Sequence, residues 1–148
     1  MASRGSKLPP SGNYTPPDNI PDDGLQQKPF FIKTKITEMM AYGLNRCDNF
    51  PRKRRQLADE IRRIMNELLF LSIRLEKMYY KKATLQDMDI ALEALRMYIV
   101  IASEPEYGVN GAPPLSIHQR EVWSRYTTEI GKMIGGYVKF VNSRDEKK

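Results

Sequence analysis

Three glycines near the end of the chain, in the stretch GKMIGGYVKF at residues 131–140, are the first feature that suggests chemistry. Glycines let a backbone approach an anion closely, so a phosphate-binding loop is one interpretation. Such a loop places its glycines before a helix begins, whereas Gly131, Gly135 and Gly136 fall within a helical pattern, where amides are already hydrogen-bonded. We therefore expect them to permit close packing of another backbone; a surface that faces nucleic acid is the alternative.

The other residue types that catalyse reactions or bind metals are isolated from one another. The single cysteine, Cys47, excludes an internal disulfide, and the single histidine, His118, leaves too few soft ligands for a zinc site. Asp87 and Asp89 lie two apart and would face different sides of a helix. A nuclease or a transferase needs convergent acids or a nucleophile beside a base. The sequence therefore predicts a protein that is not an enzyme and holds no metal or other cofactor.

A cluster of basic residues, PRKRR at residues 51–55, stands at the expected start of a helix. Cations are unfavourable at that end of the helix dipole by roughly a few tenths of a kcal/mol, so local stability does not explain the cluster. Further basic side chains follow on the half of the same helix away from its leucine stripe. The residues predicted to bind nucleic acid are Arg52, Lys53, Arg54, Arg55, Arg62, Arg63, Arg74, Lys77 and Lys81.

Net charge is unevenly distributed along the chain. The formal net charge is +6, and residues 28–82 alone carry 14 Lys and Arg against 6 Asp and Glu. The segments 1–27 and 83–148 each have a slight excess of acidic residues. A positive field of this kind attracts polyanions, through counterion release when the partner is nucleic acid. We therefore predict a nucleic-acid-binding surface in the first half of the folded region.

Apolar residues recur at helical spacing in four segments, and strand signals are few. The expected helices are residues 29–46, 52–80, 84–102 and 117–141. Thr84 is the expected N-cap of the third helix, and Ser116 with Gln119 forms a capping box for the fourth. These patterns predict an all-α protein, an antiparallel four-helix bundle.

The 148 residues, 41% of them hydrophobic, are enough for one domain with one modest core. We expect the bundle to occupy residues 29–142, after a disordered Pro- and Gly-rich arm over 1–28 and before a charged flexible tail over 143–148. No run approaches the roughly 18 apolar residues of a membrane span, and the N-terminus lacks the apolar core of a signal peptide. We therefore expect a soluble, cytoplasmic protein that binds no membrane.

The second and third expected helices are apolar on two sides. On the third helix, a second apolar series repeats at spacings of 4, 3 and 4 opposite the leucine stripe. A helix that is apolar on two sides is covered on two sides, and the simplest cover is another copy of the chain. Imperfect patterning with a few exposed apolar residues is the alternative. The predicted oligomer interface consists of Phe70, Ile73, Ile90, Ala94, Met97 and Ile101.

Several stretches resemble the accessory variability determinant (Avd) proteins of diversity-generating retroelements. They are a Phe-Pro after the first helix, LEALR in the third, LS at the start of the fourth, and the ending IGKMIGGY. The resemblance covers about residues 30–140, and the ending is its most specific part. It implies a four-helix bundle that assembles into a ring-like homopentamer. It also implies binding to the reverse transcriptase of the same retroelement and to its template RNA, in support of mutagenic cDNA synthesis and retrohoming.

The resemblance also assigns roles by position. The basic residues from Arg52 to Arg55, with Arg62, Arg63 and Arg74, correspond to contacts with nucleic acid or the polymerase. The positions that it implies are structural are Phe50, Pro51, Gly131, Gly135, Gly136 and Tyr137. The chain departs from the family pattern in its proline-rich arm, its longer third loop and a tyrosine at position 137, where tryptophan is usual. These departures concern the partners more than the fold.

Two other interpretations stay open at this point. A related family of small basic bundle proteins, encoded within ribosomal RNA insertions, would share the fold and the charge. Its second helix ends in an AEG-type motif, whereas LEKMYYKK stands at that place here. A purely structural oligomer is the other interpretation, and it would not need the basic cluster at Arg52–Arg55.

Overall fold

A computed structural model describes residues 24–146 of the chain. Most of the predicted arm and the last two residues of the predicted tail lie outside the described part. The described elements are α1 (Gly24–Asp48), η1 (Arg52–Arg54), α2 (Arg55–Lys77), α3 (Lys82–Ala102), η2 (Pro105–Tyr107) and α4 (Ile117–Glu146). Helix α1 thus begins before the predicted start at residue 29, and α4 continues into the segment predicted as a tail.

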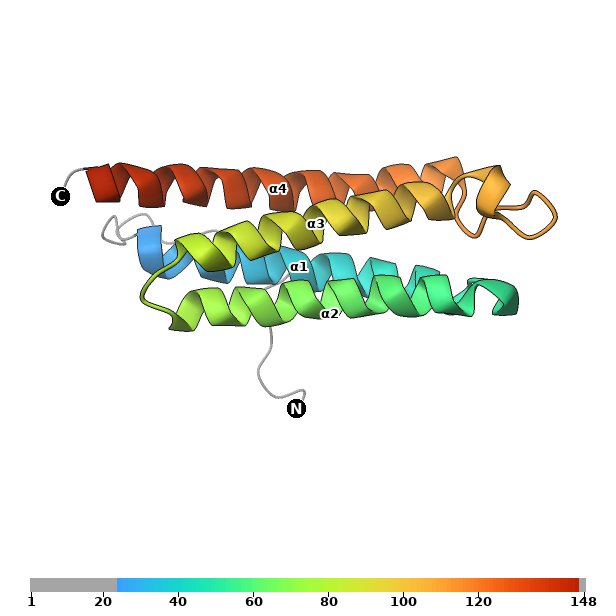
Figure 1. Cartoon of the computed structure of the whole chain (residues 1–148), viewed down its shortest axis with the longest axis horizontal. Helices are drawn as coiled ribbons and strands as arrows, with labels where there is room; N and C mark the ends of the chain where they lie inside the picture. Colours follow the sequence, from blue (N-terminus) through green and yellow to red (C-terminus); the bar gives the residue numbers. More distant parts are fainter. Residues whose placement is uncertain (1–23, 147–148) are drawn as a thin grey trace.

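The four long helices form an antiparallel bundle, as predicted (Figure 1). Helix α1 packs on α2 and α4, and α3 packs on the same two helices. Between residues 24 and 146 there is no β-strand, only an isolated bridge between Val109 and Ala112. None of the helices in this part of the chain combines the length with the apolar character that crossing a bilayer requires.

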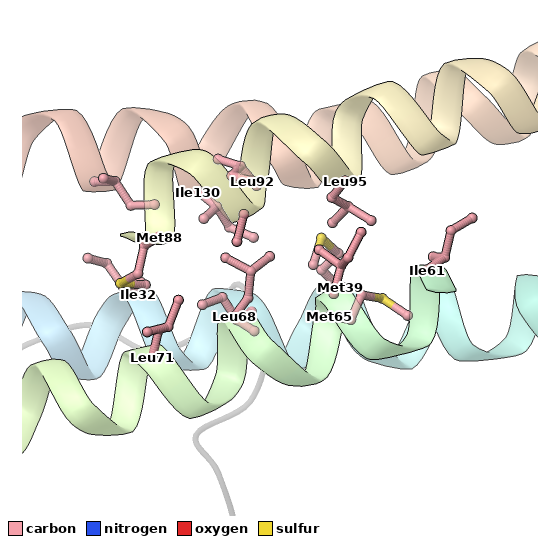
Figure 2. Close-up of a cluster of buried hydrophobic side chains, with 14 of the residues drawn as sticks. Ile32, Met39, Ile61, Met65, Leu68, Leu71, Met88, Leu92, Leu95 and Ile130 are labelled. Carbon is pink, nitrogen blue, oxygen red and sulfur yellow. The ribbon is translucent and has the colours of Figure 1, made fainter. Parts of the chain in front are cut away.

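The core is a continuous column of apolar side chains along the bundle axis (Figure 2). Ile32 and Met39 from α1, Leu68 from α2 and Leu92 from α3 all belong to this column, and all four side chains are at most 1% exposed. Ile130 from α4 closes the fourth side. Because these residues recur every three or four positions, each helix directs one stripe inward, which is the pattern on which the bundle was predicted.

The short connection between α2 and α3 differs from the prediction. Helix α2 ends at Lys77 rather than at residue 80, and α3 begins at Lys82 with Lys81 at its N-cap position. The predicted cap, Thr84, instead lies inside α3 and is buried. The Lys81 ammonium donates a hydrogen bond to the Leu75 carbonyl, which satisfies a terminal carbonyl of α2 and closes the turn.

The loop between α3 and α4 is held by its own hydrogen bonds. The predicted capping box is confirmed: the Gln119 amide donates to Ser116 Oγ at 3.0 Å, and the Ser116 amide donates to Gln119 Oε1 at 3.0 Å. Asn110 and Gly111 both have positive φ, 55° and 80°, as the tight turn between the paired residues Val109 and Ala112 requires. The loop is therefore a fixed projection at one end of the bundle.

Candidate nucleic-acid interface

Three exposed basic residues gather where α2 begins. Arg52 and Lys53 lie in η1 and Arg55 is the first residue of α2. We call these three residues the η1 cluster. Pro51 precedes it with a φ of −62°, and its carbonyl accepts a hydrogen bond from the Arg54 amide at 2.8 Å, which tightens the chain into the 3-10 turn. Within the described part of the chain, none of the three side chains forms an ion pair, so their charge is available to an anion.

Arg54, the fourth basic residue of this segment, has a structural role. Its Nε donates to the Tyr107 carbonyl at 2.7 Å and its Nη2 donates to the Gly108 carbonyl at 3.2 Å. These bonds attach η1 to the loop between α3 and α4. Arg54 was predicted to contact nucleic acid or the polymerase. In the described fold its guanidinium joins η1 to residues more than 50 positions away, a contact that local sequence could not indicate.

Acidic neighbours neutralise Arg62 and Arg63, which follow Arg55 in the first half of α2. Arg62 forms ion pairs with Asp48 at 2.9 Å and with Asp59 at 2.8 Å. Arg63 forms ion pairs with Glu60 at 2.7 Å and Glu67 at 3.1 Å. The hydrogen bonds from Arg63 lower the pKa of the Glu60 carboxyl below its ordinary value. The sequence pattern placed Arg62 and Arg63 on the outer half of the helix, yet neither adds net positive charge there.

Exposed positive charge returns at the end of α2. Arg74 and Lys77 lie in its last turn and are exposed, and no other described side chain pairs with them. We call these two residues the turn cluster. Lys81, predicted to belong with them, turns inward to the Leu75 carbonyl, and burial lowers the pKa of its ammonium. With a rise of 1.5 Å per residue, α2 separates Arg55 from Lys77 by about 33 Å.

Four of the six apolar residues predicted to form an oligomer interface are exposed, whereas Ala94 packs partly against the core. Phe70 is 64% exposed, Ile90 62% and Met97 52%. Ile73 is also exposed, whereas Ala94 and Ile101 are half-buried. The outer side of α2 therefore changes along its length from basic, through neutral and apolar, back to basic.

Among Gly131, Gly135 and Gly136 of α4, Gly131 lies against α3, where it meets side chains and not backbone, and the other two meet no other helix that the structure describes. Gly135 and Gly136 are exposed, and a Cβ built on either would meet no atom within 4 Å. A Cβ on Gly131 would meet Arg96 Nη2 at 2.5 Å, which is the end of a flexible side chain. The glycine that core packing requires is Gly43 of α1, where a Cβ would lie 2.6 Å from Met65 Sδ and 2.7 Å from Trp123 Cζ2.

Two other positions implied to be structural, Phe50 and Tyr137, lie in or beside the core. Tyr137 is fully buried, and Phe50 is half-buried and packs against the core. Cys47 is buried as well, which raises the pKa of its thiol to about 11, and His118 is exposed in the first turn of α4. Within residues 24–146 no three His, Cys, Asp or Glu side chains are grouped as metal ligands would be.

Two exposed aromatic residues, Tyr79 and Tyr80, were not among the predicted site residues. They lie in the connection between α2 and α3, directly after the turn cluster, and each is 79% exposed. The signal that could have found them is the sequence KMYYKK, in which two aromatics are flanked by lysines where the apolar helical period ends.

A comparison with protein-family models gives a match over most of the bundle. The model of the family described as bAvd-like matches residues 30–141. The chain belongs to the bAvd-like family. This confirms the resemblance to Avd proteins that the Phe-Pro, LEALR and IGKMIGGY stretches carried, and the matched region runs from α1 into α4. Among proteins of curated function, none matches the chain.

The bAvd-like match includes both basic clusters and the exposed apolar residues of α2 and α3. Arg52 and Lys77 are both within it, as are Phe70, Ile90 and Met97. The predicted arm is outside it. The features on which a binding function would depend are therefore part of the family domain.

Proposed function

We propose that this chain is a non-catalytic accessory protein of a diversity-generating retroelement. It binds the reverse transcriptase of the same retroelement and the template RNA, or the cDNA copied from it, and so supports mutagenic cDNA synthesis and retrohoming. The observation that carries the proposal is the bAvd-like match over residues 30–141. The exposed cations and exposed apolar side chains of the bundle are the physical means by which it would bind.

The η1 cluster supplies the electrostatic part of the binding. Its three cations lie close together on a short 3-10 turn and the first turn of α2, and they have no carboxylate partner in the described part of the chain. Phosphates that replace water and counterions around such a group bind with an affinity that falls steeply as salt rises. The binding is expected to be sensitive to salt and largely indifferent to sequence.

A ring-like homopentamer is the proposed assembly. Phe70, Ile90 and Met97 each expose more than half of their surface in the single chain, and their burial against a second copy would be favourable. Met97→Asp would place a charge in that contact and is expected to dissociate the oligomer. Ile101→Asp is a weaker test, since Ile101 is half-buried and the variant would also destabilise the bundle.

Light scattering of Met97→Asp measures the mass of the oligomer directly. The matched control is Thr128→Asp, which adds the same charge at an exposed position of α4. The expected result is a monomeric mass for Met97→Asp and an unchanged oligomer for the control. An oligomer of unchanged mass in Met97→Asp would exclude the outer side of α3 from the interface.

The proposed role is tested by reconstitution with the reverse transcriptase of the same retroelement. The expected result is that the two proteins co-purify and that cDNA synthesis on the template RNA depends on this chain. A charge reversal of the η1 cluster should reduce that dependence, whereas Thr128→Asp should not. A polymerase that neither binds the chain nor responds to it would contradict the proposal.

A further inference from the structure

The connection between α2 and α3 carries an aromatic surface that the fold leaves uncovered. Tyr79 and Tyr80 are each 79% exposed, and the neighbouring Met78 is 42% exposed. The two rings contact each other edge to face, with centroids 5.0 Å apart and planes inclined at 87°. An edge-to-face pair leaves open ring faces in two directions. Two large side chains thus stand in solvent with their flat surfaces available.

Closing the turn does not require the two tyrosines. The Met78 amide donates to the Arg74 carbonyl at 2.9 Å, and the Leu85 amide donates to the Lys81 carbonyl at 2.9 Å. The Lys81 ammonium bonded to Leu75 completes the connection. Neither tyrosine hydroxyl bonds to any residue that the structure describes. Local structure therefore gives no reason for aromatic side chains at these positions.

The charge around the pair is positive. Arg74 and Lys77 are exposed on the last turn of α2, and the one acidic residue between them, Glu76, is paired with Lys33 at 3.0 Å. Cations at a helix C-terminus are favourable for the helix itself, so their charge alone is weak evidence of a ligand. Exposed aromatic rings beside such cations are stronger evidence of a ligand, because the helix dipole does not account for them. Aromatic faces bind the flat surfaces of unpaired bases while neighbouring cations bind the phosphates.

We propose that Tyr79 and Tyr80 form a stacking site for unpaired bases of single-stranded RNA, with Arg74 and Lys77 holding the flanking phosphates. The inference rests on the proposed function and names the form of RNA that this end of the bundle binds. A duplex cannot use the site, because its bases are already stacked and their faces are covered. The site lies at the opposite end of α2 from the η1 cluster, about 33 Å away.

Binding of a fluorescent 12-nucleotide oligouridine RNA, measured by anisotropy, tests the proposal. The double variant Tyr79→Ala, Tyr80→Ala should bind about tenfold more weakly or worse, since stacking contributes appreciably for each base. The double variant Tyr79→Phe, Tyr80→Phe keeps both ring faces and should bind within about twofold of wild type. Tyr107→Ala, an exposed tyrosine in η2 at the other end of the bundle, is the matched control and should also bind normally.

Further measurements distinguish the stacking site from the proposed accessory function. The alanine pair should bind an RNA hairpin with a fully paired stem as wild type does, with the same dependence on salt. In one outcome, wild type binds the polymerase and RNA while the Tyr79→Ala, Tyr80→Ala variant binds oligouridine as tightly as wild type does. That result would contradict the stacking site and leave the proposed function standing. A wild-type chain that binds no RNA would contradict both.

Two other outcomes would also overturn the proposal. A loss of affinity confined to the DNA strand of the same sequence would assign the site to cDNA rather than RNA. An alanine pair whose oligomer mass changes while its RNA affinity does not would identify the tyrosines as a protein contact. Circular dichroism of each variant confirms that the exposed substitutions leave the bundle folded.

Discussion

The two ends of α2 both present exposed cations, but different features of the fold surround them. At the first end, the η1 cluster lies where the helix dipole disfavours positive charge, and Arg54 beside it is bonded to the loop between α3 and α4. At the other end, the dipole favours the turn cluster, and two exposed tyrosines follow it. The stability of the helix does not explain the cations of the η1 cluster at the first end. At the second end it does not explain the two exposed tyrosines. Each end therefore points to a ligand through a different residue type.

Between these ends the basic side chains of α2 are paired with carboxylates. The carboxylates of Glu60 and Glu67 bind Arg63, and those of Asp48 and Asp59 bind Arg62. Phe70 and Ile73 follow as exposed apolar residues. The outer side of α2 therefore presents two separate basic clusters in place of one continuous basic stripe.

The largest effect is expected from the triple variant Arg52→Glu, Lys53→Glu, Arg55→Glu. Its RNA affinity should fall by about a hundredfold at low salt, because three phosphate contacts are lost and replaced by repulsion. Helicity and oligomer mass should not change, since the side chains are exposed. The matched control reverses Arg125, Lys132 and Lys139, three exposed cations of α4, and so has the same net charge. An equal loss in the control would mean that net charge alone controls binding.

The next effect is on stability and concerns Arg54. Arg54→Ala removes two hydrogen bonds to carbonyls of the loop and should lower the free energy of unfolding by about 1 to 2 kcal/mol, measured by urea denaturation. Arg55→Ala should change stability little, because Arg55 bonds to no other described side chain. Arg55→Ala should lower RNA affinity more than Arg54→Ala does. Equal effects of the two variants on stability would contradict the structural role given to Arg54.

A smaller effect is expected from Arg74→Gln with Lys77→Gln. The slope of the logarithm of oligouridine affinity against the logarithm of salt concentration should fall by about 1.4, as two phosphate contacts are removed. The alanine pair at Tyr79 and Tyr80 should leave that slope unchanged and lower affinity at every salt concentration. A slope that responds to the tyrosines and not to the cations would reverse the roles assigned to them.

The smallest effect is expected from Arg63→Gln, in the neutral middle of α2. RNA affinity should stay within about twofold of wild type, because exposed ion pairs contribute little and the charge is already neutralised. The lowered pKa of Glu60 means that its pairing stabilises the fold at pH values above its ordinary pKa and is lost as pH falls through the lowered value. When the free energy of unfolding of Arg63→Gln is measured as pH is lowered, this small contribution should be absent. A tenfold loss of RNA affinity would show that the ion pairs open on binding.

The periodicity of the sequence was enough to predict the bundle and the direction of most side chains. Ile90 and Met97 were placed outside the core correctly, because a helix fixes the angle between residues three or four apart. The capping box of Ser116 and Gln119 was also predictable, since both partners are local. The start of α3 was not, because the turn depends on Lys81 reaching back to Leu75, and no propensity indicates that bond.

The candidate site was harder to predict, because its charges have partners that are distant in sequence. Arg54 bonds to Tyr107 and Gly108, and Arg62 is paired in part with Asp48 of α1, so spacing along α2 could not reveal either contact. The exposure of Tyr79 and Tyr80 depends on where α2 ends, which the periodic pattern placed too late. Residue type and angle identify which side chains face outward, but only the fold shows which charges remain available.

Light scattering of the purified chain for absolute mass, with and without a structured RNA and at two salt concentrations, tests the central claim most directly. The expected result is an oligomer near five times the chain mass of 17.2 kDa that gains the mass of RNA at low salt and loses it at high salt. A monomer whose mass does not respond to RNA at either salt concentration would contradict both the exposed apolar interface and the nucleic-acid interface.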